Sequence, residues 1–209
     1  MSQSGISEAS ATRDRVALEQ LRLFHRNTPV SQAMTLLTSG LAGLVFWSTA
    51  PQLHLLCWLG LTIIAAGVRL GLSWRFARLD RAGASIEAET WERWTRLSTL
   101  LSGIVWGVGG IYLYPVRDPQ REVFLCLILL GICSGAMPLQ APVRGTFPLF
   151  ASAILLPMSV LFIIKGGLIY LSIALTTLLQ LYALIVSADR YRTNIADSQR
   201  LRFENEALV

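Results

Sequence analysis

The sequence predicts an all-α membrane protein, a bundle of six transmembrane helices, and three observations support this prediction. The first is composition: 53% of the 209 residues are hydrophobic and only 15% are charged. With a mean hydropathy of +0.52, the chain is too apolar for an ordinary soluble domain. The second is a charge-free stretch within residues 91–115. The third is the placement of arginines beside apolar runs, mostly on one side of the predicted membrane.

The stretch 91–115 (WERWTRLSTLLSGIVWGVGGIYLYP) has the features of a complete membrane span. Its apolar part matches the length of about 18 residues that crosses a bilayer core. Trp91 and Trp94 precede this part, and tryptophan is typical of the headgroup depth. Tyr112 and Tyr114 form a second aromatic belt at its other end, where a proline stops the helix. This stretch therefore predicts a helix that crosses the membrane outward.

Residues 1–29 are predicted to form a cytoplasmic and interfacial segment. A helix over residues 13–28 is amphipathic, because Leu21 and Phe24 share an apolar face while arginines follow on another face. Such a helix lies on the membrane surface with its apolar face down. A solvated helix is the alternative. In either case we expect the helix to be broken at Pro29.

The transmembrane domain is predicted to cover residues 30–187. Its short connections carry proline, glycine or charged residues, which end apolar helices. A polar linker, residues 82–90, separates the second span from the third. The predicted spans are residues 30–49, 53–73, 91–115, 123–139, 147–164 and 168–187.

The distribution of positive charge predicts the orientation of these spans. With the amino terminus inside, only Arg117, Arg121 and Lys165 face the outside, and the arginines of the other connections and of both terminal segments face the cytoplasm. Arginine and lysine are enriched in cytoplasmic loops. The sequence therefore predicts six spans with both termini in the cytoplasm.

The remaining charges and polar side chains indicate neither an enzyme nor a nucleic-acid-binding protein. The net charge is +5, but the arginines flank apolar runs instead of forming a basic stripe. No nucleophile with a base, phosphate-binding loop or pair of carboxylates is recognisable. His25 is expected to be a solvated surface residue. His54 and Cys57 have no third ligand on their helix, so we expect no metal and no cofactor.

Polar and large aromatic side chains at membrane depth are the candidates for ligand binding. We predict this role for Arg69, Trp106, Tyr112 and Gln180. Three of them have an alternative role. Arg69 lies close enough to the inner headgroups to extend its charge there, Trp106 fits a packed core, and Gln180 fits a hydrogen bond between helices.

Three predicted spans contain the small-residue pattern GxxxG, which lets membrane helices approach closely. Because the three spans are neighbours, we expect these pairs to pack inside the bundle rather than to form three dimer faces. The pairs are Gly67/Gly71, Gly103/Gly107 and Gly131/Gly135.

Residues 188–209 are predicted to continue the last span as a cytoplasmic coiled-coil exit helix. A 4-3-4-3 spacing, typical of a heptad seam, starts at Leu184 and passes through Ala188, Tyr191, Ile195 and Asn205. The seam begins apolar and becomes polar. We therefore expect a parallel homodimer joined along this helix, with a solvated tether as the alternative.

The order of these features resembles the amino-terminal membrane input modules of bacterial hybrid sensor histidine kinases and diguanylate cyclases. The resemblance covers roughly residues 15–209. It implies a signal receiver in the bacterial inner membrane, usually homodimeric, whose exit helix leads into an output domain. Since no kinase or cyclase motif is present before Val209, we expect an isolated input domain. The matching pieces are Arg69, Trp91 and Trp94, residues 103–107 (GIVWG), 113–115 (LYP), 129–136 (LLGICSGA) and 201–209 (LRFENEALV).

The first functional hypothesis is therefore a sensory input domain that receives a small apolar signal and transmits it through the exit helix. A transporter or channel subunit is one alternative, although a pattern of broken helices in inverted repeats is not recognisable. A membrane anchor that only dimerises is another. The expected partners are membrane lipids, a second copy of the chain and an apolar signal molecule.

The predicted topology is testable by cysteine labelling. In a background with the three native cysteines replaced, Ser85→Cys and Gln120→Cys should react with a membrane-impermeant maleimide from opposite sides, because one predicted span, residues 91–115, lies between them. Reaction of both from the same side would overturn the six-span count.

Overall fold

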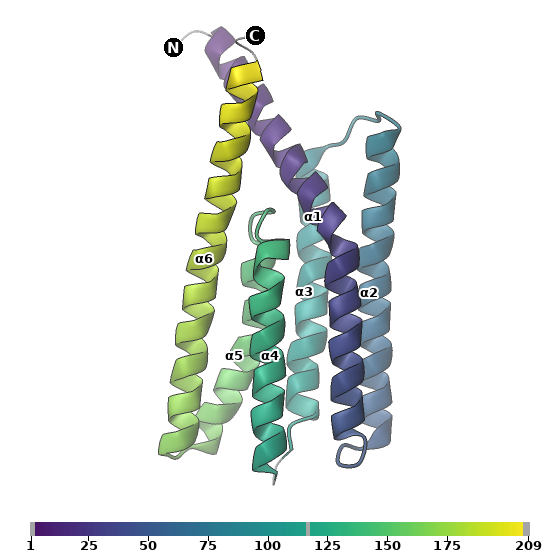
Figure 1. The fold of residues 1–209 in the computed structure, drawn as a ribbon, viewed down its shortest axis with the longest axis vertical. Coiled ribbons are helices and arrows are strands. Elements are labelled where there is room, and N and C mark those ends of the chain that lie inside the picture. The colour runs from purple at the N-terminus through teal and green to yellow at the C-terminus, as the bar shows by residue number, and fades with distance from the viewer. Residues whose placement is uncertain (1–2, 116–117, 207–209) are drawn as a thin grey trace.

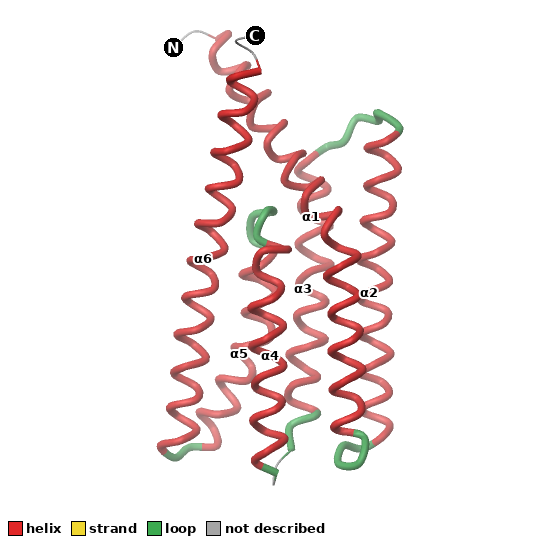
Figure 2. The backbone as a smooth tube through the Cα atoms, viewed as in Figure 1, coloured by secondary structure: helices red, strands yellow, loops and turns green. Residues whose placement is uncertain are grey.

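The computed structural model describes the backbone of residues 3–115 and 118–206, and the side chains of residues 15–115, 118–199 and 201. All regular structure in these residues is helical and none is strand, so the all-α prediction is confirmed. Figures 1 and 2 show the arrangement. The helices are α1 (Gln3–Phe46), α2 (Gln52–Arg81), α3 (Ala88–Tyr112), α4 (Pro119–Gln140), α5 (Thr146–Lys165) and α6 (Leu168–Glu206).

The helices run alternately up and down in one bundle (Figure 1). The α2–α3 and α4–α5 connections lie at the same end as the start of α1 and the end of α6, and the other three turns lie at the opposite end. We call the first the arginine-rich end and the second the far end. The arginines at the arginine-rich end include Arg22, Arg75, Arg78, Arg81, Arg93, Arg96, Arg144, Arg190 and Arg192.

Five of the described helices, all except α3, are long and apolar enough to cross a membrane. Large apolar side chains cover their outward faces. Leu44, Ile64 and Ile164, for example, are 78%, 62% and 77% exposed. A surface of this kind is suited to lipid rather than to water. The prediction of a helical membrane protein is therefore confirmed.

Helix α3 is less apolar because small and hydroxyl-bearing side chains fill its buried face. Ser98, Thr99 and Ser102 are all buried, followed by Gly103 and Gly107. This helix contacts α1, α2, α4 and α5. A helix enclosed by protein does not need large apolar side chains on every face. That α3 crosses the membrane, and the count of six spans, stay predictions.

Helix α1 is continuous through Pro29, so the predicted break before the first span is wrong. Proline removes one backbone donor, but packing over the adjoining turns holds the helix together. Leu21 and Phe24 do share an apolar face, as predicted. This face is buried against Phe76 and Val143 of the same chain instead of lying on the membrane surface.

The predicted domain boundaries fall within helices. The boundary between residues 29 and 30 lies inside α1, and the boundary between residues 187 and 188 lies inside α6. Helix α6 therefore continues from the bundle into its polar last part without a hinge of irregular backbone. The assignment of separate tasks to residues 1–29, 30–187 and 188–209 stays a prediction.

Gly103 and Gly107 bring α3 against the backbone of α5. A Cβ atom on Gly103 would lie 2.9 Å from the carbonyl oxygen of Phe150, and one on Gly107 would overlap the carbonyl oxygen of Ala153. This pair therefore packs inside the bundle, as predicted. The other two pairs do not, because a Cβ on any of their glycines has no neighbour within 4 Å; they are Gly67/Gly71 and Gly131/Gly135.

A polar cluster joins α4, α5 and α6 near the far end. Lys165 Nζ donates hydrogen bonds to Glu122 Oε1 at 2.9 Å and to the Tyr114 hydroxyl at 2.5 Å. The Tyr170 hydroxyl donates to Glu122 Oε2 at 3.1 Å. Both charged groups of this cluster thus have a partner of opposite sign.

The α3–α5 contact predicts unequal effects of two glycine substitutions. Gly107→Ala should lower the free energy of unfolding by about 1–3 kcal/mol, because the added methyl group forces the helices apart. Gly67→Ala is the matched control, in which an open position gains up to about 1 kcal/mol from helix propensity. Reversible unfolding in mixed micelles measures both, and equal effects would contradict the close contact.

Candidate functional site

His25 lies at the junction of α1, α2 and α3 and is only 6% exposed. Its Nδ1 atom is 3.0 Å from Ser73 Oγ, and its Nε2 atom is 3.4 Å from Thr95 Oγ1. A neutral imidazole donates through one nitrogen and accepts through the other, and a hydroxyl serves either role. The prediction of a solvated surface histidine is therefore wrong, because tertiary packing covers this face of α1.

Aromatic rings enclose the imidazole of His25. Phe76 stacks on it with ring centroids 4.4 Å apart, and Phe24 and Trp91 make edge contacts at 5.4 and 5.9 Å. Phe76 and Trp91 also pack against each other at 5.2 Å. These rings shield the hydrogen bonds of His25 from solvent, which strengthens them.

Arg69 is the second buried polar residue at this junction, with 3% of its surface exposed. Its guanidinium carbon lies 5.6 Å from the centroid of the Phe24 ring. The Nε atom has no hydrogen-bond partner among the described residues, and no described carboxylate compensates the charge. An uncompensated charge away from water is costly, so this residue lowers the stability of the fold.

Further donors without partners lie along the same three helices. The contacts of His25 fix the register, in which α1 runs antiparallel to α2 and parallel to α3. Arg69 and Thr99 are each one helical turn deeper in the bundle than the two hydroxyls bound to His25. Thr99 Oγ1 is buried and has no hydrogen-bond partner among the described residues. The same holds for Nε2 of Gln32, which lies two turns deeper than His25 on α1.

We call His25, Arg69, Ser73, Thr95 and Thr99 the Arg69 cluster. It contains one fixed positive charge, one imidazole and three hydroxyl groups, and it lacks a described acid. Such a set of groups favours a negatively charged or strongly accepting partner. It also holds α1 between α2 and α3 by polar contacts, which are directional and are lost together when a helix shifts.

The structure places the four predicted ligand residues in separate surroundings. Arg69 lies in the cluster above. Trp106 is 2% exposed and makes an edge contact with Trp58 at 5.1 Å, as its alternative role in the core would require. Tyr112 is 62% exposed at the far end, and Gln180 is exposed on α6. A ligand role for all four stays a prediction, and no contact brings them together here.

One sequence pattern points to the hydroxyl-bearing residues of the Arg69 cluster, which are not among the predicted site residues. Thr95, Ser98, Thr99 and Ser102 are spaced three or four residues apart, which puts their hydroxyl groups on one side of an otherwise apolar helix. A polar stripe of this kind indicates a polar helix–helix interface in a membrane protein. It does not indicate the partner helix, and so His25 was not connected with it.

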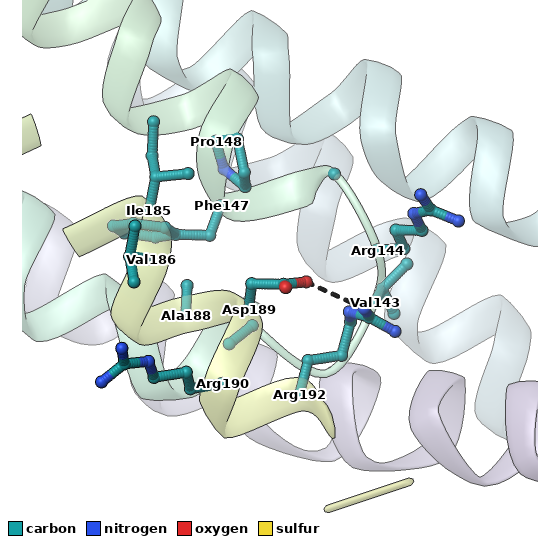
Figure 3. Close-up of a pocket in the computed structure, with 12 residues that line it drawn as sticks. Val143, Arg144, Phe147, Pro148, Ile185, Val186, Ala188, Asp189, Arg190 and Arg192 are labelled. Atoms are coloured by element: carbon teal, nitrogen blue, oxygen red, sulfur yellow. Dashed lines mark hydrogen bonds and ion pairs between the residues drawn. The ribbon is translucent and has the colours of Figure 1, made fainter. Parts of the chain in front are cut away.

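A cleft of about 450 Å³ separates α6 from the α4–α5 turn at the arginine-rich end (Figure 3). Phe147 and Ile185 line its apolar part. Asp189 accepts a hydrogen bond from Arg192 Nη2 at 2.8 Å, within the same helix. Figure 3 shows Arg144 on the turn, pointing away from α6. These side chains therefore do not converge on a common ligand.

The predicted dimer seam on α6 has a mixed environment. Ala188 is 3% exposed and is covered by its own chain, whereas Tyr191 is 41% exposed and Ile195 is half-buried. The side chain of Asn205 lies outside the described residues. The seam and the homodimer stay predictions, and in this arrangement a second copy meets the seam only beyond Ala188.

Comparisons with protein-family models, curated proteins and solved structures give no match. The fold and the site together define a class: a helical membrane bundle with a buried arginine between three helices, without a counter-charge among the described side chains, and one long helix that extends beyond the bundle.

Lys165 and Arg69 predict opposite effects of the same substitution. Lys165→Met should lower the free energy of unfolding by about 1–3 kcal/mol, because the buried carboxylate of Glu122 loses its partner. Arg69→Met should leave stability unchanged or raise it, since it removes a charge without a partner. Unfolding in mixed micelles measures both. A loss for Arg69→Met as large as for Lys165→Met would show that the arginine is compensated within the fold.

Proposed function

We propose that this chain is the membrane-embedded input domain of a bacterial signalling protein, which receives a small, mainly apolar signal and passes it along α6. The observation that carries the proposal is the length of this helix. Its 39 residues begin in an apolar span at the far end and continue past the arginine-rich end of the bundle without a break (Figure 1). At 1.5 Å per residue it is a rod of roughly 60 Å.

The packing of α6 supports its role as a lever. Ala174, Leu181 and Leu184 are buried within the bundle, and α6 packs mainly against α5. Farther along, the cleft beside Asp189 loosens the contact with the α4–α5 turn. A helix that is fixed along one part and loosely held along the next transmits a small rotation or shift to whatever follows it.

Helix α1 supplies a second connection to α6. The two helices contact each other, and Figure 1 shows them converging only at the arginine-rich end. Between the membrane and this end, α1 passes through the Arg69 cluster. A signal that changes how α1 sits between α2 and α3 therefore reaches α6 through protein contacts alone.

The Arg69 cluster also explains how two states of the bundle stay close in free energy. A ligand shifts only an equilibrium whose states differ by a few kcal/mol. A core in which every buried charge has a partner would strongly favour one arrangement of the helices. A buried charge without a described partner, such as Arg69, destabilises the arrangement that contains it. Natural proteins accept such a cost mainly at functional sites.

The orientation and the output follow from the same proposal. The arginine-rich end faces the cytoplasm of the bacterial inner membrane, as expected from the enrichment of arginine on that side. Both termini are then cytoplasmic, and the end of α6 meets the output domain, a histidine kinase or a diguanylate cyclase, in a homodimer. The resemblance in the order of motifs is the support for this choice of output.

The proposal is testable in a fusion of residues 1–209 to the dimerisation and catalytic domains of a histidine kinase. Arg69→Met should change the rate of autophosphorylation in membranes, by about tenfold for each 1.4 kcal/mol by which the equilibrium shifts. Arg75→Met, at an exposed position of the same helix, is the matched control and should leave the rate unchanged. Equal rates in both variants and the parent would contradict signalling through the Arg69 cluster.

A further inference from the structure

A groove of about 330 Å³ lies between α1 and α4, on the outside of the bundle. Its volume is at the lower end of the range of about 300–1,000 Å³ that ligand pockets occupy. Nearly all of its lining comes from these two helices, and Phe150 of α5 completes it. The residues that line it are Ser31, Met34, Thr35 and Thr38 of α1, Ile128, Gly131, Ile132, Gly135, Ala136, Leu139 and Gln140 of α4, and Phe150.

The glycines of α4 keep this groove open. A Cβ atom added to Gly131 or Gly135 would have no neighbour within 4 Å. The GxxxG pair of α4 is therefore unused inside the chain, although α1 and α4 are in contact. A stripe of small residues alone does not define a ligand, and a polar atom in the groove supplies that information.

Gln140 is the polar residue at one end of the groove. It is 1% exposed, and its Oε1 atom is buried without a hydrogen-bond partner among the described residues. Its backbone carbonyl accepts a hydrogen bond from Thr146 Oγ1, which fixes the last turn of α4. A buried acceptor without a donor costs about 1–3 kcal/mol. The Oε1 atom is closed off from the groove in this arrangement, so a ligand reaches it only when the Gln140 side chain turns toward the groove, and pairing the acceptor offsets the cost of that turn.

The hydroxyl groups in the groove do not satisfy this acceptor. Thr35 Oγ1 donates to the carbonyl of Ser31 at 2.9 Å, and Thr38 Oγ1 donates to the carbonyl of Met34 at 2.8 Å. Both threonines therefore present oxygen lone pairs to the groove while their protons are used within α1. The groove consequently offers acceptors along an otherwise apolar surface.

We propose that the α1–α4 groove binds a small aliphatic molecule that carries a hydroxyl donor, with the hydroxyl at Gln140 and the apolar chain along Gly131 and Gly135. Such a molecule partitions into the membrane and reaches the groove from the lipid. A hydrocarbon without a donor leaves the Gln140 acceptor unpaired. A charged molecule finds no partner of opposite sign among the residues that line the groove.

A helix of a second copy is about 10 Å wide, so it can only lie across the mouth of this groove and leaves the interior unfilled. A short alcohol, by contrast, fits into the available space and replaces lipid tails that cannot donate a hydrogen bond.

The groove is a signal site only if the proposed function is correct, because this inference names the chemical class of the proposed signal. The binding itself does not depend on signalling. Binding to the purified chain without effect on a fused kinase would contradict the proposed function and leave the groove as a binding site.

The experiment is photolabelling of the purified chain in detergent with an octanol that carries a diazirine. Peptide mass spectrometry should place the label on residues 31–38 and 128–140, and excess 1-octanol should reduce it at least about fivefold. Excess octyl methyl ether, which has no donor, should protect much less. The expected preference of about five- to tenfold corresponds to roughly 1–1.4 kcal/mol.

Two variants and a control complete this experiment. Gly135→Leu fills the groove and Gln140→Leu removes the acceptor, so both should abolish protection by 1-octanol. Gly67→Leu introduces the same side chain on the open face of α2 and should behave as the parent. Uniform labelling of all lipid-facing helices, or equal labelling of the parent and Gly135→Leu, would overturn the proposal.

Discussion

The rest of the bundle depends on the close approach of α3 to α5. Gly103 and Gly107 allow backbone contact there, with no room for a Cβ atom at Gly107. Lipid tails are as apolar as leucine, so this contact between small residues provides attraction that hydrophobic burial does not. It places α3 in the middle of the protein, where α1, α2 and α4 also contact it. The central position in turn explains why α3 carries serine, threonine and glycine on its buried face, and α3 is not among the five described helices that are apolar enough to cross a membrane.

The charged side chains at the two ends of the bundle differ in whether they have a partner of opposite charge. At the far end, Lys165 and Glu122 are paired and surrounded by tyrosine hydroxyls, which makes this end a fixed point for α4, α5 and α6. Near the arginine-rich end, Arg69 is buried without compensation beside a histidine that bridges two hydroxyl groups. The far end is therefore expected to stay rigid, and movement is expected where α1 crosses the Arg69 cluster.

The α1–α4 groove and the α6 helix lie on either side of this movable part. Helix α1 forms one wall of the groove, contributes His25 to the Arg69 cluster and then approaches α6. In the proposed mechanism, a ligand in the groove changes the spacing of α1 and α4 close to the cluster. The same helix thus connects the proposed ligand site, the proposed two-state cluster and the proposed output helix, and each step uses contacts between neighbours.

Hydropathy, helix length and charge placement in the sequence determined that the protein is a helical membrane bundle, because these properties act locally along each helix. They also identified the apolar face of Leu21 and Phe24 and singled out Arg69 as a polar side chain at membrane depth. The sequence did not determine what each face touches. Only the tertiary structure decided that Gly107 packs on α5 while Gly135 borders a groove, although both belong to the same motif. In the same way, it decided that α1 continues through Pro29 and that His25 is buried. The physical reason is that periodicity specifies the direction of a side chain relative to its own helix, whereas the neighbour on that side is chosen by the packing of all six helices together.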